Sequence, residues 1–412
     1  MPTGAIATTT GSTPPAAAAP AQGPSPSSDR LDPDDLVYVG AFRLPPDPAE
    51  QGWEWGGAAL TYYPQGDPAG PDDGFPGSLF GTGHDWTQQV SEISIPVPVI
   101  GGDLDALSTA ETLQPFADIR GDLFDFSSFE LPRAGLEYLD DGGDRLHFAW
   151  GQHYEDDGPV YTHGSAGVDL GDPDPAGPWR IGGAPMYASN DYLFTVDPDW
   201  AAANTPGMLL ATGRFRDGGW GGQGPSLYVY DPGGRGGPPE TQLPAVALLQ
   251  YGSSLDDSDI TVDGYHQSDE WNGGAWLRWR GRAAVVFAGT KGIGECWYGF
   301  ENGVVWPDEP PHPSIPDPPY DDRGWWSSRF EAQFLFYDPG DLAAVASGEL
   351  GPHQPQPYAA KVVDDVLFAE RRETGKGRLG AAAFDAGHGL LYALELHGDE
   401  DRPVVHVWRI GG

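Results

Sequence analysis

The chain has 412 residues and a formal net charge of −39, with 60 glycines, 42 prolines and one cysteine. Such an acidic chain argues against nucleic acid and anionic membrane surfaces as partners. One cysteine excludes a disulfide framework within the chain, and no apolar run approaches the roughly 20 residues that cross a bilayer, so we expect no membrane insertion.

The chain begins with a segment, residues 1–30, built almost entirely of Ala, Pro, Thr, Ser and Gly. This composition buries too little apolar surface to order itself, so we expect a disordered tail or tether. The segment lacks the basic start and apolar core of a secretory signal, but it resembles the spacer that follows one. We therefore expect a secreted or cell-surface protein whose signal was removed or lies upstream, with a single domain over residues 31–412.

From there a four-strand pattern recurs five times. The first strands of the five units are 57–60, 134–136, 191–193, 274–277 and 380–383. The second strands are 79–83, 146–151, 209–213, 285–289 and 391–395. The third strands are 90–95, 166–170, 226–230, 333–337 and 404–408. Fourth strands follow in four units, at 112–117, 178–181, 245–249 and 358–363. Only 200–203 and 341–346 are typical of short helical turns.

The strand that the fifth unit lacks is present at the other end of the chain, at residues 36–43. A repeated four-strand unit that cannot bury its own faces is typical of a β-propeller, and closure by an N-terminal strand removes an exposed edge. The sequence therefore predicts an all-β, five-bladed β-propeller closed by an N-terminal strand. The largest insertion is expected between Cys296 and Phe330.

The charged residues differ between the two faces of the predicted propeller. The turns between first and second strands are acidic, whereas the loops of the opposite face carry basic residues and histidines. The basic residues are Arg133, Arg214, Arg216, Lys291, Arg323, Arg329, Lys376 and Arg378, and the histidines are His84, His153, His163, His266 and His397. An electropositive channel mouth would attract an anionic ligand, whereas pairing of each cation with a carboxylate would leave it neutral. Both alternatives stay open.

One position differs between the units. It is Ala58, Ala134, Ala275 and Gly380 in four of them, but Asp191, preceded by Asn190, in the third. A carboxylate at the crowded axis must be paired, so Asp191 is either a structural residue that fills the channel with its hydrogen bonds or a functional residue.

Each of three loops that follow second strands has a Gly turn with polar or aromatic side chains. They contribute His84, Asp85 and Trp86, then His153 and Tyr154, then Arg214 and Arg216. These residue types suit a carbohydrate, and the basic mouth favours an anionic one. The tryptophans either provide stacking surfaces for sugar rings or pack between blades. The tryptophans are Trp53, Trp55, Trp86, Trp220, Trp271, Trp325 and Trp326.

The strand-closed ring of five blades resembles the propeller glycosidases of the arabinanase and fructosidase type. The resemblance implies a general acid, a base or nucleophile and a third carboxylate at the channel mouth. Asp85, Asp191, Glu295 and, deeper in a first strand, Glu137 could fill these positions. Where the family's base usually lies, this chain has Trp55-Gly56-Gly57 instead.

The residues also resemble those of propeller-shaped polysaccharide lyases. That resemblance implies proton abstraction by His153 or Tyr154, with Arg214 neutralising a uronate. Hydrolysis, elimination and non-catalytic ligand recognition or protein scaffolding therefore all stay open. No cofactor motif is present. The Asp-rich turn 140–144 could hold a structural calcium ion or be an ordinary turn.

Overall fold

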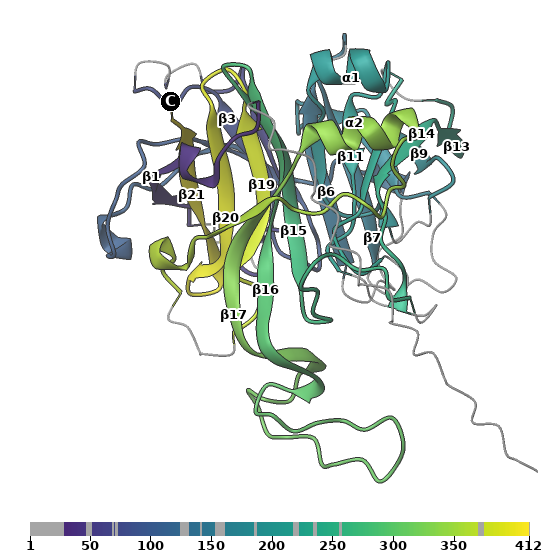
Figure 1. Ribbon diagram of the computed structural model, residues 1–412. Coiled ribbons are helices and arrows are strands. Elements are labelled where there is room, and N and C mark those ends of the chain that lie inside the picture. Colours follow the sequence, from purple (N-terminus) through teal and green to yellow (C-terminus); the bar gives the residue numbers. More distant parts are fainter. Residues whose placement is uncertain are drawn as a thin grey trace, which may run out of the picture.

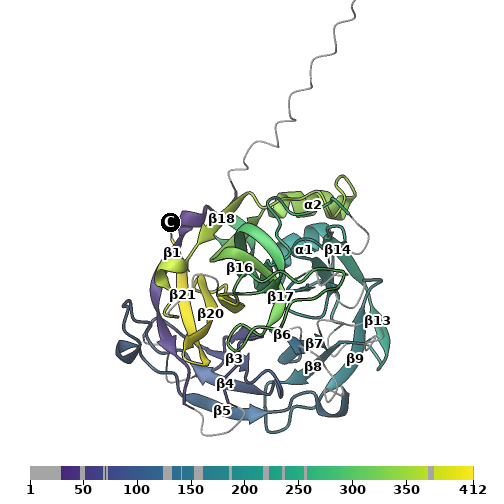
Figure 2. The same cartoon turned by 90° about the horizontal axis from the view of Figure 1, so that it is seen from below.

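The computed structural model describes residues 29–46, 52–67, 70, 73–123, 132–140, 142–152, 161–184, 188–216, 222–233, 237–254, 258–369 and 375–411. It contains five antiparallel sheets arranged in a ring, the arrangement of a five-bladed β-propeller, as predicted (Figure 1, Figure 2). Most of the predicted tail lies outside the described residues. Of its last residues, Arg30 forms an ion pair with Asp338 at 3.5 Å.

Each blade runs from an inner strand at the ring axis to an outer strand. Blade one is β2 (Leu60–Tyr63), β3 (Ser78–Thr82), β4 (Val90–Ser94) and β5 (Thr112–Ala117). Blade two is β6 (Pro132–Leu139), β7 (Arg145–Gln152), β8 (His163–Gly167) and β9 (Ala176–Ile181), to which β13 (Thr241–Leu243) adds a parallel fifth strand. Blade three is β10 (Leu193–Thr195), β11 (Leu210–Thr212), β12 (Leu227–Tyr230) and β14 (Ala245–Leu249).

Blade four is β15 (Glu270–Trp279), β16 (Arg282–Phe300), β17 (Arg323–Tyr337) and β18 (Ala359–Val362). Blade five is β19 (Leu379–Asp385), β20 (Leu390–Asp399), β21 (Arg402–Ile410) and, as its outer strand, β1 (Leu36–Arg43). The described helices are α1 (Pro198–Asn204), α2 (Pro339–Ser347) and the 3-10 turns Pro33–Asp35, Leu104–Ala106, Gly121–Leu123 and Asp364–Val366. The predicted strands all coincide with these elements to within a few residues.

Closure of the ring by β1 is confirmed. β1 pairs antiparallel with β21 from Leu36 opposite Ile410 to Arg43 opposite Val404, with a register shift next to Gly40. Gly40 has a φ of +128°, and a Cβ there would lie 2.7 Å from the backbone of Val99. Only glycine fits this close approach, which covers the outer edge of the last blade.

The inner strands crowd the ring axis, and this explains their small residues. A Cβ on Gly135 would lie 1.9 Å from the carbonyl oxygen of Asp191, and one on Gly273 would lie 2.5 Å from the amide nitrogen of Ala382. The space left between the inner strands is a cavity of about 10 Å³, roughly the size of one water molecule. The two mouths of the ring are therefore separate.

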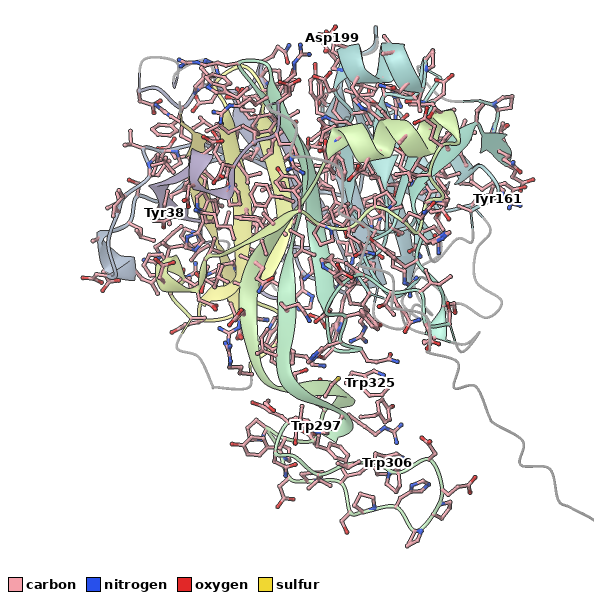
Figure 3. All side chains as sticks on the ribbon, in the orientation of Figure 1. Tyr38, Tyr161, Asp199, Trp297, Trp306 and Trp325 are labelled. Carbon is pink, nitrogen blue, oxygen red and sulfur yellow. The ribbon has the colours of Figure 1, made fainter. Side chains whose placement is uncertain are left out.

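The predicted insertion is a two-stranded extension of blade four. Beyond Thr290 and before Gln333, β16 and β17 pair only with each other, and we call residues 291–332 the arm. The arm projects from one face of the ring, the arm side, whereas α1 and α2 lie toward the opposite face, the helix side (Figure 1). Trp297, Trp306 and Trp325 lie on the arm, and Asp199 lies on the helix side (Figure 3).

No helix in the described residues is long and apolar enough to cross a membrane.

Candidate functional site

Each mouth of the ring has a cavity. The arm-side cavity, of about 400 Å³, lies between the arm base and blade five and is lined by Trp55, Trp326, Lys376 and His397 among others. The helix-side cavity, of about 670 Å³, is lined by the ends of all five inner strands. The larger cavity is therefore at the mouth opposite the one that the loop residues predicted.

Asp191 lies in a buried polar cluster on the arm side of the axis. Its Oδ1 accepts a hydrogen bond from Arg133 Nε at 3.3 Å, and its Oδ2 accepts one from the Phe215 amide at 3.1 Å. Arg133 also donates to Asn272 Oδ1 at 2.8 Å, and its guanidinium lies 3.9 Å from the centre of the Phe215 ring. Asn272 in turn donates to the Leu379 carbonyl at 2.7 Å. Asp191 thus has the partners that a buried carboxylate requires, and it joins blades two to five.

Asp85 and its neighbours lie beside this cluster. Burial raises the pKa of Asp85, and the positive charges of Arg133 and His84 oppose that rise. The structure therefore brings Asp85, Arg133 and Asp191 together, although neither carboxylate lines either cavity. The Trp86 side chain is 83% exposed, and its ring centre lies 5.3 Å from that of His84.

The other predicted site residues are dispersed. His153 and Tyr154 lie outside the described residues. Arg214 is buried and donates through Nε to the Arg216 carbonyl at 2.7 Å. Asn190 is buried against Gly151, and a Cβ on that glycine would lie 2.1 Å from the Asn190 amide nitrogen. Glu295 is exposed on the arm, where its own amide donates to Ser328 Oγ at 3.0 Å.

Ion pairs neutralise most of the predicted basic mouth. Five of its eight cations lie within 4.0 Å of a carboxylate: Arg133 with Asp191, Arg216 with Glu270, Lys291 with Asp269, Arg329 with Glu331, and Arg378 with Asp364. His163 is not at the mouth at all. It is buried between blades two and three, and burial lowers its pKa to about 3. Of the two alternatives left open by the sequence, the described contacts favour a largely neutral mouth.

Lys376 differs from these five paired cations. Its Nζ lies 4.3 Å from the centre of the Trp326 ring, and no ion pair joins it to a carboxylate in the described part of the chain. Burial lowers the pKa of Lys376 to about 8. The indole nitrogen of Trp326 is buried and has no hydrogen-bond acceptor among the described residues. Two donors at this cavity therefore lack acceptors.

Backbone strain marks the same cavity. Trp55 and His397 both have a φ of +57°, in the left-handed region that side chains other than glycine rarely adopt. Their rings meet edge to face with centres 5.0 Å apart, and Trp55 is 50% exposed. Desolvation lowers the pKa of His397, and the charge of Asp401 opposes that lowering. Strain of this kind concentrates at functional sites.

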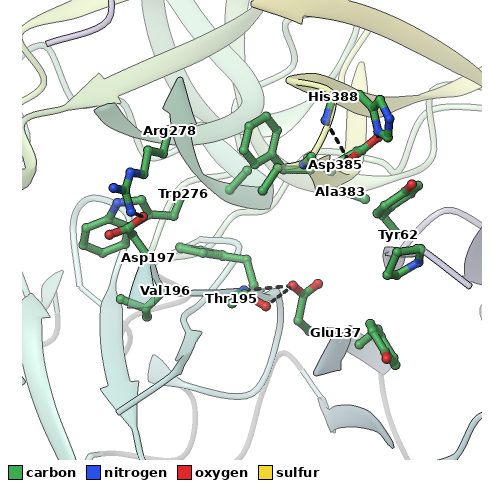
Figure 4. Close-up of a pocket in the computed structure, with 18 of the residues that line it drawn as sticks. Tyr62, Glu137, Thr195, Val196, Asp197, Trp276, Arg278, Ala383, Asp385 and His388 are labelled. Carbon is green, nitrogen blue, oxygen red and sulfur yellow. Dashed lines mark hydrogen bonds and ion pairs between the residues drawn. The ribbon is translucent and has the colours of Figure 1, made fainter. Parts of the chain in front are cut away.

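The helix-side cavity contains Glu137, one of the predicted catalytic residues (Figure 4). Its Oε1 accepts hydrogen bonds from the amide and hydroxyl of Thr195 at 2.9 and 2.5 Å, and its Oε2 accepts one from Thr61 at 2.8 Å. Burial raises the pKa of Glu137 to about 7, against the lowering effect of these hydrogen bonds. Part of the side chain remains accessible from the cavity.

The sequence analysis missed the wall of this cavity, but the repeat contains a signal for it. Four residues after the small axial position, the five units have Tyr62, Tyr138, Thr195, Trp279 and Phe384. Four of the five are aromatic, and all of them line the helix-side cavity. This signal lies at the end of each inner strand, whereas Asp191 lies at the start of one.

Within the described residues, no group of three or more His, Cys, Asp or Glu side chains is arranged to hold a metal ion. The predicted calcium turn includes Asp141, which lies outside them.

Comparison with known proteins leaves the chain without an assigned family. No protein-family model and no curated protein matches the sequence. Among solved structures, the β-propeller domain of Cps50 (Swd1) from Myceliophteria thermophila has 10% sequence identity and a TM-score of 0.25, over 91% of this chain and 99% of that one. At this score the likeness carries no argument, and the propeller assignment rests on the five sheets and their closure.

Proposed function

We propose that this protein binds an acidic carbohydrate in the arm-side cavity. The observation that carries the proposal is Lys376, a partly buried cation without an ion pair to a carboxylate among the described residues. A buried charge is costly unless it is paired. A ligand carboxylate would supply the missing partner.

The other walls suit the rest of a sugar. Trp55 is half exposed and offers a ring face for stacking against a sugar ring. Glu400 and Asp401 are exposed at the rim, where their carboxylates can accept hydrogen bonds from hydroxyl groups. A uronate residue has a carboxylate for Lys376, an apolar ring face for Trp55, and hydroxyl groups for Glu400 and Asp401.

Binding is better supported than hydrolysis. Of the carboxylates predicted for catalysis, Asp85 and Asp191 lie beside Arg133, Glu295 lies on the arm and Glu137 lies at the other mouth. A glycosidase needs two carboxyl groups on either side of one bond. None of these four carboxylates lines the arm-side cavity, whose own carboxylates are Glu301, Glu395, Glu400 and Asp401.

Elimination is the second candidate, and His397 is the observation that favours it. Its imidazole, whose pKa is lowered, could take the proton from the carbon next to a uronate carboxylate that Lys376 neutralises. A carbon–carbon double bond would then form as the bond to the leaving sugar oxygen breaks, and that oxygen would take up a proton from water. The product would be an unsaturated uronate.

Titration of the purified chain with oligogalacturonate, and with a neutral oligosaccharide of the same length, tests the proposal. We expect binding of the acidic ligand only, and Lys376→Met should weaken it by about tenfold to a hundredfold, the usual effect of losing a hydrogen bond to a charged group. Lys361→Met is the matched control, because Lys361 is paired with Asp34 at 3.7 Å on the outer strand of blade four. Equal affinity of wild type and Lys376→Met would exclude the site, and ultraviolet absorbance of unsaturated uronate in the same samples detects elimination.

A further inference from the structure

The helix-side cavity has the form of a small-molecule site. At about 670 Å³ it lies in the range of ligand pockets. Its wall combines Tyr62, Tyr138, Trp279 and Phe384 from four inner strands with Trp276 and Phe194 (Figure 4). Aromatic faces of this kind attract both apolar groups and cations.

Two of the three carboxyl groups in this wall contact a basic side chain. Asp197 forms an ion pair with Arg278 at 2.7 Å, and Asp385 Oδ2 lies 2.8 Å from His388 Nδ1. Glu137, the third carboxyl group of the lining, has no cation within ion-pair distance among the described residues. The remaining titratable neighbours, Tyr62, Tyr138 and Tyr230, are neutral over the physiological range because burial raises the pKa of each.

We propose that the helix-side cavity binds an organic cation, a protonated amine whose ammonium group pairs with Glu137 and whose carbon skeleton lies against the aromatic wall. The Glu137 carboxylate has about four lone-pair sites, and Thr61 and Thr195 occupy three of them. The remaining site is on Oε2, and part of the side chain is accessible from the cavity. An ammonium N–H can therefore bind without breaking the hydrogen bonds already present.

The surroundings favour a cation over an anion. Arg278, one of the two arginines in the wall, is shared between Asp197 and Asp199, so its charge is already neutralised. The other, Arg280, is exposed, and its guanidinium lies 5.8 Å from the centre of the Trp279 ring. The exposed turns of this face carry further carboxylates, including Asp73, Asp140 and Asp144. They create a negative field at the opening that attracts cations and repels anions.

A purely structural role for Glu137 is the competing explanation, because its hydrogen bonds join β2, β6 and β10. Three neutral donors do not offset the cost of burial, since the pKa remains raised to about 7. A glutamine of the same shape would join the strands without carrying a charge. The raised pKa also fixes the pH dependence: the carboxylate is half ionised near pH 7, so affinity for an amine should increase from pH 6 to pH 8.

Calorimetric titration with benzylamine and benzyl alcohol tests the proposal, because the two probes share a ring and differ in charge. We expect the wild-type protein to bind benzylamine at least tenfold more tightly, with an affinity that increases by about tenfold between pH 6 and pH 8. Glu137→Gln should abolish both the preference and the pH dependence. Glu331→Gln on the arm removes the same charge from the other face and should change neither.

Trp279→Ala provides an independent measurement if the Glu137 variant does not fold. It should weaken benzylamine binding at least fivefold by removing one ring from the wall. Equal binding of the amine and the alcohol, a flat pH profile in the wild type, or an amine preference that survives Glu137→Gln would each overturn the proposal. Binding of neutral oligosaccharide at this mouth in place of the amine would overturn it as well. None of these results depends on the arm-side site.

Discussion

The two mouths of this propeller differ in the sign of the partly buried charge that has no counter-ion among the described residues. On the arm side, five cations are paired with carboxylates and Lys376 is not. On the helix side, Asp197 is paired with Arg278 and Asp385 contacts His388, whereas Glu137 has no basic partner among the described residues. Burial shifts the pKa of both groups toward neutrality, to about 8 for Lys376 and about 7 for Glu137. The partly buried group without a counter-ion, Lys376 on one face and Glu137 on the other, therefore indicates the ligand better than the net charge of the face does.

The two mouths are separate because the ring is closed, and removing β1 should open the ring. Deletion of residues 1–43 should leave β21 unpaired and expose the side chains that pack under Leu36 and Phe42, at a cost of roughly 5 kcal/mol or more. Deletion of residues 1–28, predicted from composition to be a tail, is the control. Thermal unfolding of both truncations measures the difference, and equal melting temperatures would contradict closure by β1.

Variants of the buried cluster around Asp191 distinguish a structural role of this residue from a catalytic one. Arg133→Met should destabilise the protein by about 3 to 5 kcal/mol, because it leaves the buried Asp191 carboxylate without its ion partner. Asp191→Asn should cost roughly 1 to 3 kcal/mol through mismatched hydrogen bonds. Chemical unfolding measures both changes. If Asp191→Asn has wild-type stability but cleaves no acidic oligosaccharide that the wild type cleaves, Asp191 is a working group.

The raised pKa of Glu137 predicts that the stability of the protein depends on pH, and Glu137→Gln should remove this dependence. A carboxyl group whose pKa is raised from 4.5 to about 7 on folding binds more protons when folded, so its contribution falls as pH rises from about 4.5 to 7. The wild type should therefore lose on the order of 3 kcal/mol relative to the Gln variant across that interval. Unfolding free energies of both proteins at pH 5 and pH 8 provide the test, and a constant difference would show that Glu137 is not buried as described.

Much of the fold could be predicted because it depends on local repetition. The strands follow from a unit repeated five times, and closure follows from the one strand left over at residues 36–43. The arm was predicted only as an insertion. Its form as an extended hairpin depends on pairing between residues such as Trp297 and Trp326, which no local pattern specifies.

The candidate sites were less predictable because they depend on contacts between distant blades. Sorting charges by face indicated Arg133, and comparing the small axial position between the units indicated Asp191, but neither could show that the two residues pair with each other. Lys376 was one of eight equivalent cations in the sequence, and only the structure distinguishes it as the one over Trp326. The helix-side cavity was missed because the aromatic position at the ends of the inner strands was not compared between the units.

The most direct test of two independent mouths is a calorimetric titration of one protein sample, first with oligogalacturonate and then with benzylamine. We expect each ligand to bind with the same affinity whether or not the other is present, because the inner strands leave only about 10 Å³ between the two cavities. Lys376→Met should lose only the first ligand and Glu137→Gln only the second. Displacement of one ligand by the other, or loss of both ligands in either folded variant, would contradict the account.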